Sequence, residues 1–387
     1  MKINIIDGIM SVGKSSFAID MINKDSSNTY LYITPFLPEC DRVVTQCSSK
    51  KFTQPNGKFG SKTKHFKEML KKNKNIVSTH SLFKGVDDET RDILQSSNYI
   101  LILDEVLDVV EKVNISSKDL ENILSKYVEV NEKCEMVWTD RKYRGKYDEY
   151  KNLCDEGCLM LINNTVVMWS FPAEIFKYFK EVYILTYLFD FQVQKYYFDF
   201  YDIEYNYKTI DRNEEGYFLT DKGCSNYEKL KKQQAKQLIE IYQGKSNIIG
   251  NNKYDLSKSW YDKATDNQKK ELSNNLFNYF KNTTKTKSKQ NGWTTFKNYI
   301  GDISRKGYTN GFIPVNCRAT NEHQDNCSLA YPVNRFIDPY FKHMFELKDI
   351  EVNEDGWALS EMLQWIWRGS IRKNEPMKLY LPSYRMR

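Results

Sequence analysis

Apolar residues occur along the chain in short runs that alternate with segments of helical spacing. Lys2–Ile6 is rich in apolar residues and leads into a glycine-containing loop, after which Ser16–Ile22 has apolar residues at helical spacing. Further strand-like runs lie at Thr29–Pro35, Asn75–His80, Tyr99–Leu103 and Val182–Tyr187. Continuous apolar runs are typical of strands that are buried on both faces of a parallel sheet. The pattern therefore predicts an α/β fold built on parallel strands.

The length of 387 residues is enough for two domains, at about 100 to 200 residues each. We place the first domain at residues 1–192 and the second at 193–387. A break in the strand pattern predicts an insertion at about 116–180. A Lys-, Gln- and Asn-rich region of helical periodicity at about 221–290 predicts either a helical insertion in the second domain or a flexible connector. Lys378–Ser383 is expected to be the last strand of a second sheet.

The loop after the first strand reads G-x-x-x-x-G-K-S, which is a pattern that binds phosphates. Its glycines let backbone N–H groups wrap the phosphates at a helix N-terminus, the lysine places a positive charge near the β and γ oxygens, and the final serine can hold a metal ion. The residues expected to contact the nucleotide are Gly8, Ser11, Gly13, Lys14, Ser15 and Ser16. A chance match in a turn is the alternative interpretation.

An acidic pair follows the buried strand at residues 99–103. Asp104 and Glu105 stand at its carboxyl end, where parallel sheets bind their ligands. Asp104 is expected to hold Mg²⁺ through water, and Glu105 to orient and deprotonate the attacking water in nucleotide hydrolysis. The pair could instead be an N-cap and a first-turn acid of the following helix.

Composition narrows the class of protein without deciding its function. Hydrophobic residues make up 40% and charged residues 28% of the chain, which is typical of a globular protein. The net charge of +6 permits contact with nucleic acid but does not demand it. The eight cysteines include no C-x-x-C pair, so we expect no zinc site. The chain has neither a signal-peptide pattern nor an apolar run of about 18 residues, so we expect a cytoplasmic protein without membrane contact.

Together these motifs resemble those of the helicase-like ATPases of superfamily two, including phage-encoded ones, which are built from two RecA-like domains. Motif I resembles residues 8–15, motif Ia residues 33–35, and the strand-end motif after it residues 78–80. Motif II resembles residues 104–105, motif III residues 185–187, motif IV residues 291–296 and motif V residues 311–321. The resemblance implies that Thr186 and Thr320 couple ATP hydrolysis to movement on nucleic acid. It also implies contacts with nucleic acid by Thr34, Pro35, Thr79, His80 and Thr295, although His80 could equally be a structural histidine.

The segment Leu359–Arg372 is predicted to be a helix with Gln364, Arg368 and Arg372 on one face at four-residue spacing. It resembles motif VI, whose glutamine and two arginines reach the γ-phosphate. The family usually has its second arginine three residues after the first and a glycine before the first. Here the spacing is four, and Trp367 stands where the glycine is expected. A basic amphipathic surface helix is the alternative.

The resemblance implies an ATP-dependent helicase or translocase that uses ATP and Mg²⁺ bound between two domains. Single-stranded or forked DNA is its expected partner, together with replication proteins, in the cytoplasm of the host if the chain is phage-encoded. Three alternatives stay open. A nucleoside kinase of the thymidine-kinase type shares a similar glycine loop, but lacks this length and usually has a zinc-binding cysteine cluster. A packaging ATPase of the terminase type shares both nucleotide motifs, and an inactive helicase fold would serve as a nucleic-acid-binding scaffold.

Overall fold

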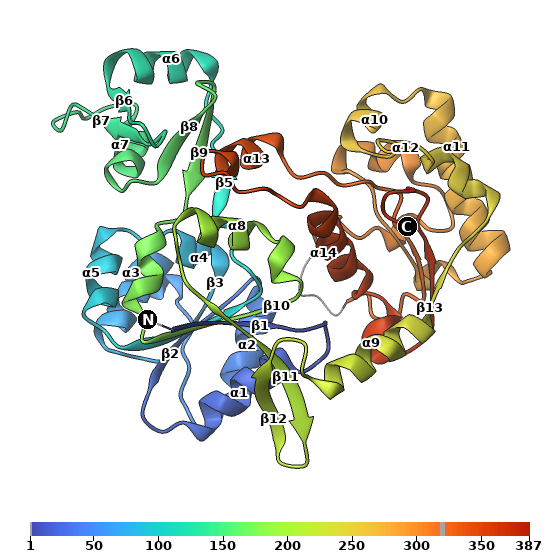
Figure 1. Ribbon diagram of the computed structural model, residues 1–387, viewed down its shortest axis with the longest axis horizontal. Helices are drawn as coiled ribbons and strands as arrows, with labels where there is room; N and C mark the ends of the chain where they lie inside the picture. Colours follow the sequence, from blue (N-terminus) through green and yellow to red (C-terminus); the bar gives the residue numbers. More distant parts are fainter. Residues whose placement is uncertain (1, 318–321) are drawn as a thin grey trace. The chain divides into compact units, whose positions relative to one another are not determined.

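The computed structural model describes residues 2–317 and 322–387, which form two compact units (Figure 1). Unit 1 comprises Met1–Asp7, Lys14–Gly223 and Asp338–Val352, and unit 2 comprises Gly8–Gly13, Cys224–Ile337 and Asn353–Arg387. The division differs from the expected boundary at residue 192, because residues 193–223 group with unit 1. The reason lies in the sheet of that unit, which the chain extends beyond residue 192.

Unit 1 is built on a seven-stranded sheet with the strand order β12-β11-β1-β10-β4-β2-β3. Its strands are β1 (Lys2–Asp7), β2 (Thr29–Thr34), β3 (Ile76–Thr79), β4 (Tyr99–Asp104), β10 (Glu181–Thr186), β11 (Asn206–Asn213) and β12 (Gly216–Asp221). All neighbours pair in parallel except β12, which is antiparallel to β11. The strands predicted from the apolar runs are therefore confirmed, whereas the sequence pattern missed the hairpin of β11 and β12.

Helices separate most of the parallel strands of unit 1 along the chain. They are α1 (Lys14–Lys24), α2 (Leu37–Gln46), α3 (Lys62–Lys71), α4 (His80–Lys84), α5 (Asp88–Gln95) and α8 (Val193–Phe200). The later segment Asp338–Val352 adds α13 (Pro339–Glu346) to this unit. Helix α1 buries Ala18, Ile19 and Ile22, at the spacing that the sequence pattern predicts. Within the part of the chain that the structure describes, no helix has both the length and the apolar character needed to cross a bilayer.

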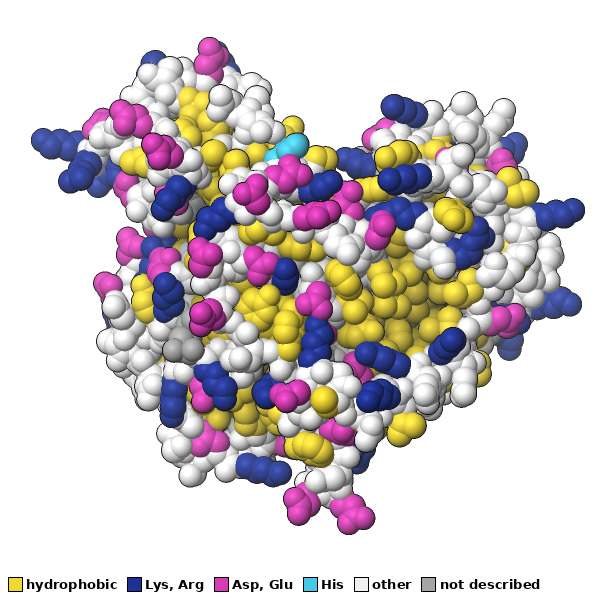
Figure 2. Space-filling model, viewed as in Figure 1, with side chains coloured by type: hydrophobic (Ala, Val, Ile, Leu, Met, Phe, Trp, Pro, Cys, Tyr) yellow, Lys and Arg dark blue, Asp and Glu magenta, His cyan; other side chains and the backbone are white. Residues whose placement is uncertain are grey.

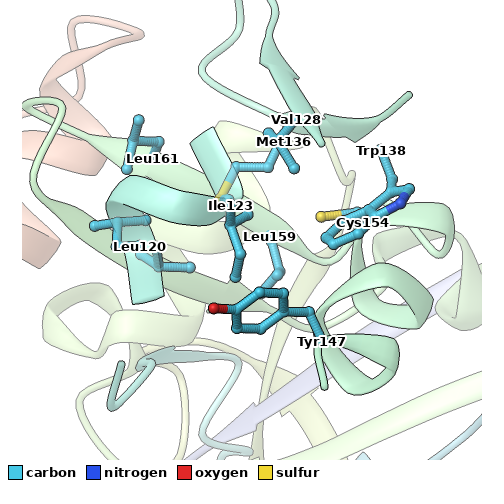
Figure 3. Close-up of a cluster of buried hydrophobic side chains, with 10 residues drawn as sticks. Leu120, Ile123, Val128, Met136, Trp138, Tyr147, Cys154, Leu159 and Leu161 are labelled. Atoms are coloured by element: carbon cyan, nitrogen blue, oxygen red, sulfur yellow. The ribbon is translucent and has the colours of Figure 1, made fainter. Parts of the chain in front are cut away.

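The predicted insertion between β4 and β10 has a hydrophobic core of its own. It contains β5 (Val110–Lys112), α6 (Ser117–Lys126), β6 (Val128–Val130), β7 (Met136–Trp138), α7 (Asp148–Asp155), β8 (Leu159–Ile162) and β9 (Val166–Ser170). Strands β5, β9 and β8 form one antiparallel sheet, and β6 and β7 form another. Leu120 and Ile123 of α6 pack with Trp138, Tyr147 and Leu159 in this core (Figure 3).

Unit 2 is built on a second parallel sheet, of four strands in the order β13-β16-β15-β14. Its strands are β13 (Ile239–Ile241), β14 (Asn291–Trp293), β15 (Ser328–Ala330) and β16 (Met377–Tyr380), and its helices are α9 (Asn226–Leu238), α10 (Lys258–Lys263), α11 (Asp266–Asn278), α12 (Ile300–Ile303) and α14 (Glu354–Ile366). Trp293 and Trp365 are fully buried, and the Trp365 ring lies 5.1 Å from that of Tyr331. The prediction of a second sheet is confirmed.

The prediction of one continuous helix over Leu359–Arg372 is wrong. Helix α14 ends at Ile366, and a separate 3₁₀ turn, η9, spans Ser370–Lys373. The Ser370 N–H donates to the Asn326 carbonyl at 2.9 Å, and a Cβ at Gly369 would lie 2.8 Å from that oxygen. This close approach of two backbones, which only glycine permits, draws the chain out of the helix.

We expect Ile123→Ala to destabilise the insertion by about 2–5 kcal/mol, because it leaves a cavity in a closed core. Ile123 is fully buried there. Urea unfolding followed by tryptophan fluorescence measures the loss, since Trp138 lies in the same core. Lys118→Ala, at an exposed position of α6, is the control. An Ile123→Ala transition that coincides with wild type would contradict the packing described above.

Candidate nucleotide-binding site

Polar residues stand at the carboxyl ends of five neighbouring parallel strands in unit 1. The strand register pairs Asp7 with Thr186, Leu185 with Asp104, and Thr34 with Thr79. The five strand-end residues are Asp7, Thr186, Asp104, Thr34 and Thr79. Ligands of open parallel sheets bind at this edge. The five strands therefore place polar side chains where a ligand is expected to bind.

The glycine loop, residues 8–15, has the backbone conformation of a tight turn. Gly13 has a φ of 97° and Ser11 a φ of 63°, and the Val12 N–H donates to the Ile9 carbonyl at 3.3 Å. The left-handed value at Gly13 accounts for a glycine at this position. Helix α1 begins at Lys14, directly after the turn, so the order of strand, loop and helix is as predicted. N–H groups at such a helix start attract anions.

The loop serine and the acidic strand end lie in contact, although 89 residues separate them in the sequence. The Ser15 hydroxyl donates to the two carboxylate oxygens of Asp104 at 3.1 and 3.2 Å. A hydroxyl and a carboxylate are oxygen ligands of the kind that Mg²⁺ prefers. Ser15 and Asp104 therefore fit a shared magnesium site beside the glycine loop.

Two further side chains contact Asp104, and the sequence analysis missed both. The Tyr32 hydroxyl donates to Asp104 Oδ2 at 2.9 Å, and Arg42 Nη2 lies 3.7 Å from the same oxygen. Burial raises the pKa of Asp104 and the neighbouring Glu105 adds to the rise, whereas Arg42 and Tyr32 act to lower it; the net result is a pKa of about 6. Neither contact has a local signal in the sequence, because both partners come from another strand and helix.

Glu105 directly follows β4 in a strained backbone conformation. Its φ is 75°, a left-handed value that is uncommon for a residue with a side chain, and its N–H donates to the Leu185 carbonyl at 3.0 Å. Such outliers persist where the surrounding structure holds them, often at functional sites. The hydrogen bond to β10 fixes the backbone at the residue predicted to activate water.

Two strand-end residues of this group, Asp7 and Thr34, differ in their polar contacts. Asp7 Oδ1 accepts from the Leu188 N–H at 2.8 Å, and Asp7 Oδ2 lies 3.3 Å from Lys222 Nζ. Burial raises the pKa of Asp7, while the charge of Lys222 opposes the rise. The Thr34 hydroxyl is fully buried and has no hydrogen-bond partner within residues 2–317 and 322–387.

The other residues predicted to couple or to contact nucleic acid fall into both units. The buried Thr186 hydroxyl accepts from the Gln192 amide at 3.1 Å. Pro35 follows β2, and His80 begins α4 directly after Thr79. In unit 2, Thr295 is buried two residues after the end of β14, while Thr320 lies outside the described residues.

The three residues of the predicted late motif lie in unit 2, but not on one helix. Gln364 is on α14 and is 4% exposed, and neither polar atom of its amide has a hydrogen-bond partner among the residues that the structure describes. Arg368 is buried just beyond the helix. Burial lowers the pKa of His323, and the charge of Arg368 acts in the same direction, while Glu322 opposes it. Arg372 lies in η9 and is half-buried.

The surface charge does not by itself locate a nucleic-acid site. On the face shown in Figure 2, Lys and Arg side chains are intermingled with Asp and Glu side chains. The strand-end geometry is therefore a better guide to function than the modest net charge.

The two parallel sheets and the glycine loop define a helicase-like α/β fold. The structure is similar to one described as an XPD helicase, with a TM-score of 0.50 and 11% identity, over 98% of this chain and 92% of that one. It is also similar to S. tokodaii Xpd4, with a TM-score of 0.52 and 11% identity, over 99% and 92% of the two chains. At this identity the likeness concerns the fold alone. The predicted α/β class with two RecA-like domains is confirmed.

The chain belongs to the YonV family. The SPbeta prophage-derived uncharacterized protein YonV of Bacillus subtilis strain 168 is 41% identical over 399 residues, which cover 100% of this chain and 97% of that protein. The model of the YonV C-terminal Rossmann-like domain matches residues 233–387, and that of the YonV middle domain matches residues 110–169. The second match coincides with the insertion that has its own core, and the prophage origin of the relative agrees with the predicted phage link.

We expect ionisation of Asp104 to destabilise the protein as the pH rises through about 6. The folded-state pKa of about 6 lies above the ordinary value of 3.8, so between these values the unfolded chain has lost a proton that the folded chain retains. The wild type therefore loses stability between pH 3.8 and about 6 relative to Asp104→Asn. Chemical denaturation of both proteins across this range measures the difference. A difference that does not change with pH would contradict the raised pKa.

Proposed function

We propose that this protein is an ATP hydrolase that uses the energy of hydrolysis to move along or remodel nucleic acid, with DNA as the first candidate. The observation that carries the proposal is the contact between Ser15 and Asp104, at 3.1 and 3.2 Å. It joins the glycine loop to the acidic strand end, as a nucleotide site with a metal ion requires. The similarity to XPD helicase folds supports the same proposal.

In this proposal, the backbone of the glycine loop and the start of α1 bind the phosphates, with Lys14 as the positive charge beside them. Ser15 and Asp104 hold Mg²⁺, which neutralises charge on the phosphates when bound. The contact of Arg42 with Asp104 favours the ionised carboxylate that a metal ion needs.

Glu105 is the proposed base that orients and deprotonates the attacking water. Its place after Asp104 puts it at the carboxyl edge of the sheet, and its strained backbone is held by the bond to Leu185. A glutamate in this position follows the proposed metal ligand Asp104 directly in the sequence, and its carboxylate can accept a proton.

The proposed nucleic-acid contacts lie at the other end of the same sheet edge. Thr34 and Thr79 are direct register partners on β2 and β3, and Pro35 and His80 follow them. Strand β4 with Asp104 is the neighbour of β2. One row of strand ends thus offers separate groups for the nucleotide and for the nucleic acid. In unit 2, Thr295 is proposed as a further contact with nucleic acid and Thr320 as a coupling residue.

Gln364, Arg368 and Arg372 are proposed to act on the γ-phosphate. The buried amide of Gln364, without a partner among the described residues, supports a polar ligand for it. Arg368 and Arg372 do not lie on one helix, because α14 ends at Ile366 and Arg372 lies in η9. Which of the two arginines contacts the γ-phosphate is therefore left to experiment.

We expect the wild type to hydrolyse ATP, and single-stranded DNA to change the rate. Lys14→Ala should abolish the activity by removing the phosphate charge, and Glu105→Gln should lower kcat by about 100-fold or more, the size of a general-base effect. Steady-state release of phosphate with and without DNA measures both.

Glu121→Gln, an exposed site on α6, is the matched control for the glutamate variant. The proposal fails if the wild type has no turnover under either condition, or if Glu105→Gln hydrolyses ATP as fast as the wild type does.

An arginine that contacts the γ-phosphate should affect kcat more than nucleotide affinity. We expect Arg368→Ala or Arg372→Ala to lower kcat by about 100-fold, since it removes charge stabilisation in the transition state. Arg305→Ala, an exposed arginine of unit 2, is the control. Single-turnover hydrolysis with saturating ATP identifies which arginine acts, and normal rates in both variants would exclude them.

A further inference from the structure

A glutamate from a distant helix accepts a hydrogen bond from the glycine loop. The Ile9 N–H donates to Glu228 Oε1 at 3.1 Å, over a separation of 219 residues in the sequence. Ile9 is 4% exposed and Glu228 6% exposed. Gly8–Gly13 and Glu228 belong to the same compact unit. No nucleotide motif contains Glu228, so the sequence analysis did not single it out.

The position of Glu228 is itself fixed by local contacts in α9. Its own N–H donates to the hydroxyl of Ser225, the N-cap of the helix, at 2.9 Å. Lys232, one helical turn later, lies 2.8 Å from the same Oε1 that accepts from Ile9. The lysine balances the charge of the buried carboxylate, and the cap sets the start of the helix that presents it.

A buried backbone N–H requires an acceptor, and here a side chain outside the loop supplies it. The bond is made at the second residue of the loop, ahead of the turn at Ser11 and Gly13 that the phosphates are expected to need. A carboxylate that binds the loop backbone at this point sets the path by which the chain leaves β1 and enters the turn.

We propose that Glu228 is a positioning residue of the nucleotide site, which holds the glycine loop in its phosphate-binding conformation through the Ile9 N–H. The inference rests on the proposed function, because it assumes that the loop binds a nucleotide. Helix α9, which lies outside all of the nucleotide motifs, thereby contributes to nucleotide affinity.

The experiment compares two substitutions that separate reach from charge. Glu228→Asp keeps the charge but withdraws the carboxylate by one methylene, so it loses the bond to Ile9. Glu228→Gln keeps the length and an acceptor oxygen. We expect Glu228→Asp to raise the Kd for a fluorescent ATP analogue with Mg²⁺ by about tenfold, or about 1.4 kcal/mol. Glu228→Gln should stay close to wild type, and kcat at saturating ATP should change little in either variant.

Glu240→Asp, at an exposed site on β13, is the matched control. An unchanged Kd in Glu228→Asp would overturn the inference, as would an equal loss in both variants, which indicates a general packing role. Tighter binding by Glu228→Asp would overturn it in favour of a carboxylate that competes with phosphate. If the wild type itself binds no nucleotide, the proposed function fails first.

Hydrogen exchange of the Ile9 amide tests the same contact without a substitution. The buried bond to Glu228 predicts slow exchange in the wild-type protein before any nucleotide is added. Exchange as fast as that of Ser11, an exposed residue of the same loop, would overturn the inference.

Discussion

The candidate site depends on the parallel register of the strands in unit 1. Because β1, β10, β4 and β2 run in the same direction, their carboxyl ends meet at one edge. That edge brings Ser15 within hydrogen-bond distance of Asp104 across 89 residues of sequence. A shift of β4 by one residue would turn Asp104 to the opposite face of the sheet, since side chains alternate along a strand. The contact between Ser15 and Asp104 is thus a consequence of sheet register.

The same edge buries acidic side chains, whose ionised forms cost free energy when no cation is bound. Burial raises the pKa of Asp104, and the hydrogen bond to Leu185 holds Glu105 at a strained, positive φ. Arg42 and Tyr32 offset part of the cost at Asp104. In the free protein, the surroundings of Asp104 favour its protonated form. A bound cation would favour the ionised carboxylate instead. The interdependence of burial and charge gives a physical reason for the acidic pair. The pair does not cap a helix, because the next element along the chain is strand β5.

The insertion and unit 2 each add structure beyond the first sheet. The insertion has a separate core around Ile123 and Trp138, and it coincides with the match to the YonV middle domain. Unit 2 supplies a second parallel sheet, which a short nucleoside kinase would not require. Glu228 ties the conformation of the glycine loop to helix α9 of that unit. The fold therefore agrees with the helicase-like class and not with the shorter kinase alternative.

The sequence alone determined strands β1, β2, β3, β4 and β10 of the first sheet, the glycine loop and the acidic pair, because local periodicity and short motifs encode them. It did not determine where the late helix ends: Ser370 bonds to the distant Asn326 carbonyl, and this contact ends the regular spacing at Ile366. The contacts of Tyr32 with Asp104 and of Glu228 with Ile9 were likewise decided by tertiary structure alone. Hydrogen bonds between residues far apart in the chain leave no periodic signal, so only the folded backbone reveals them.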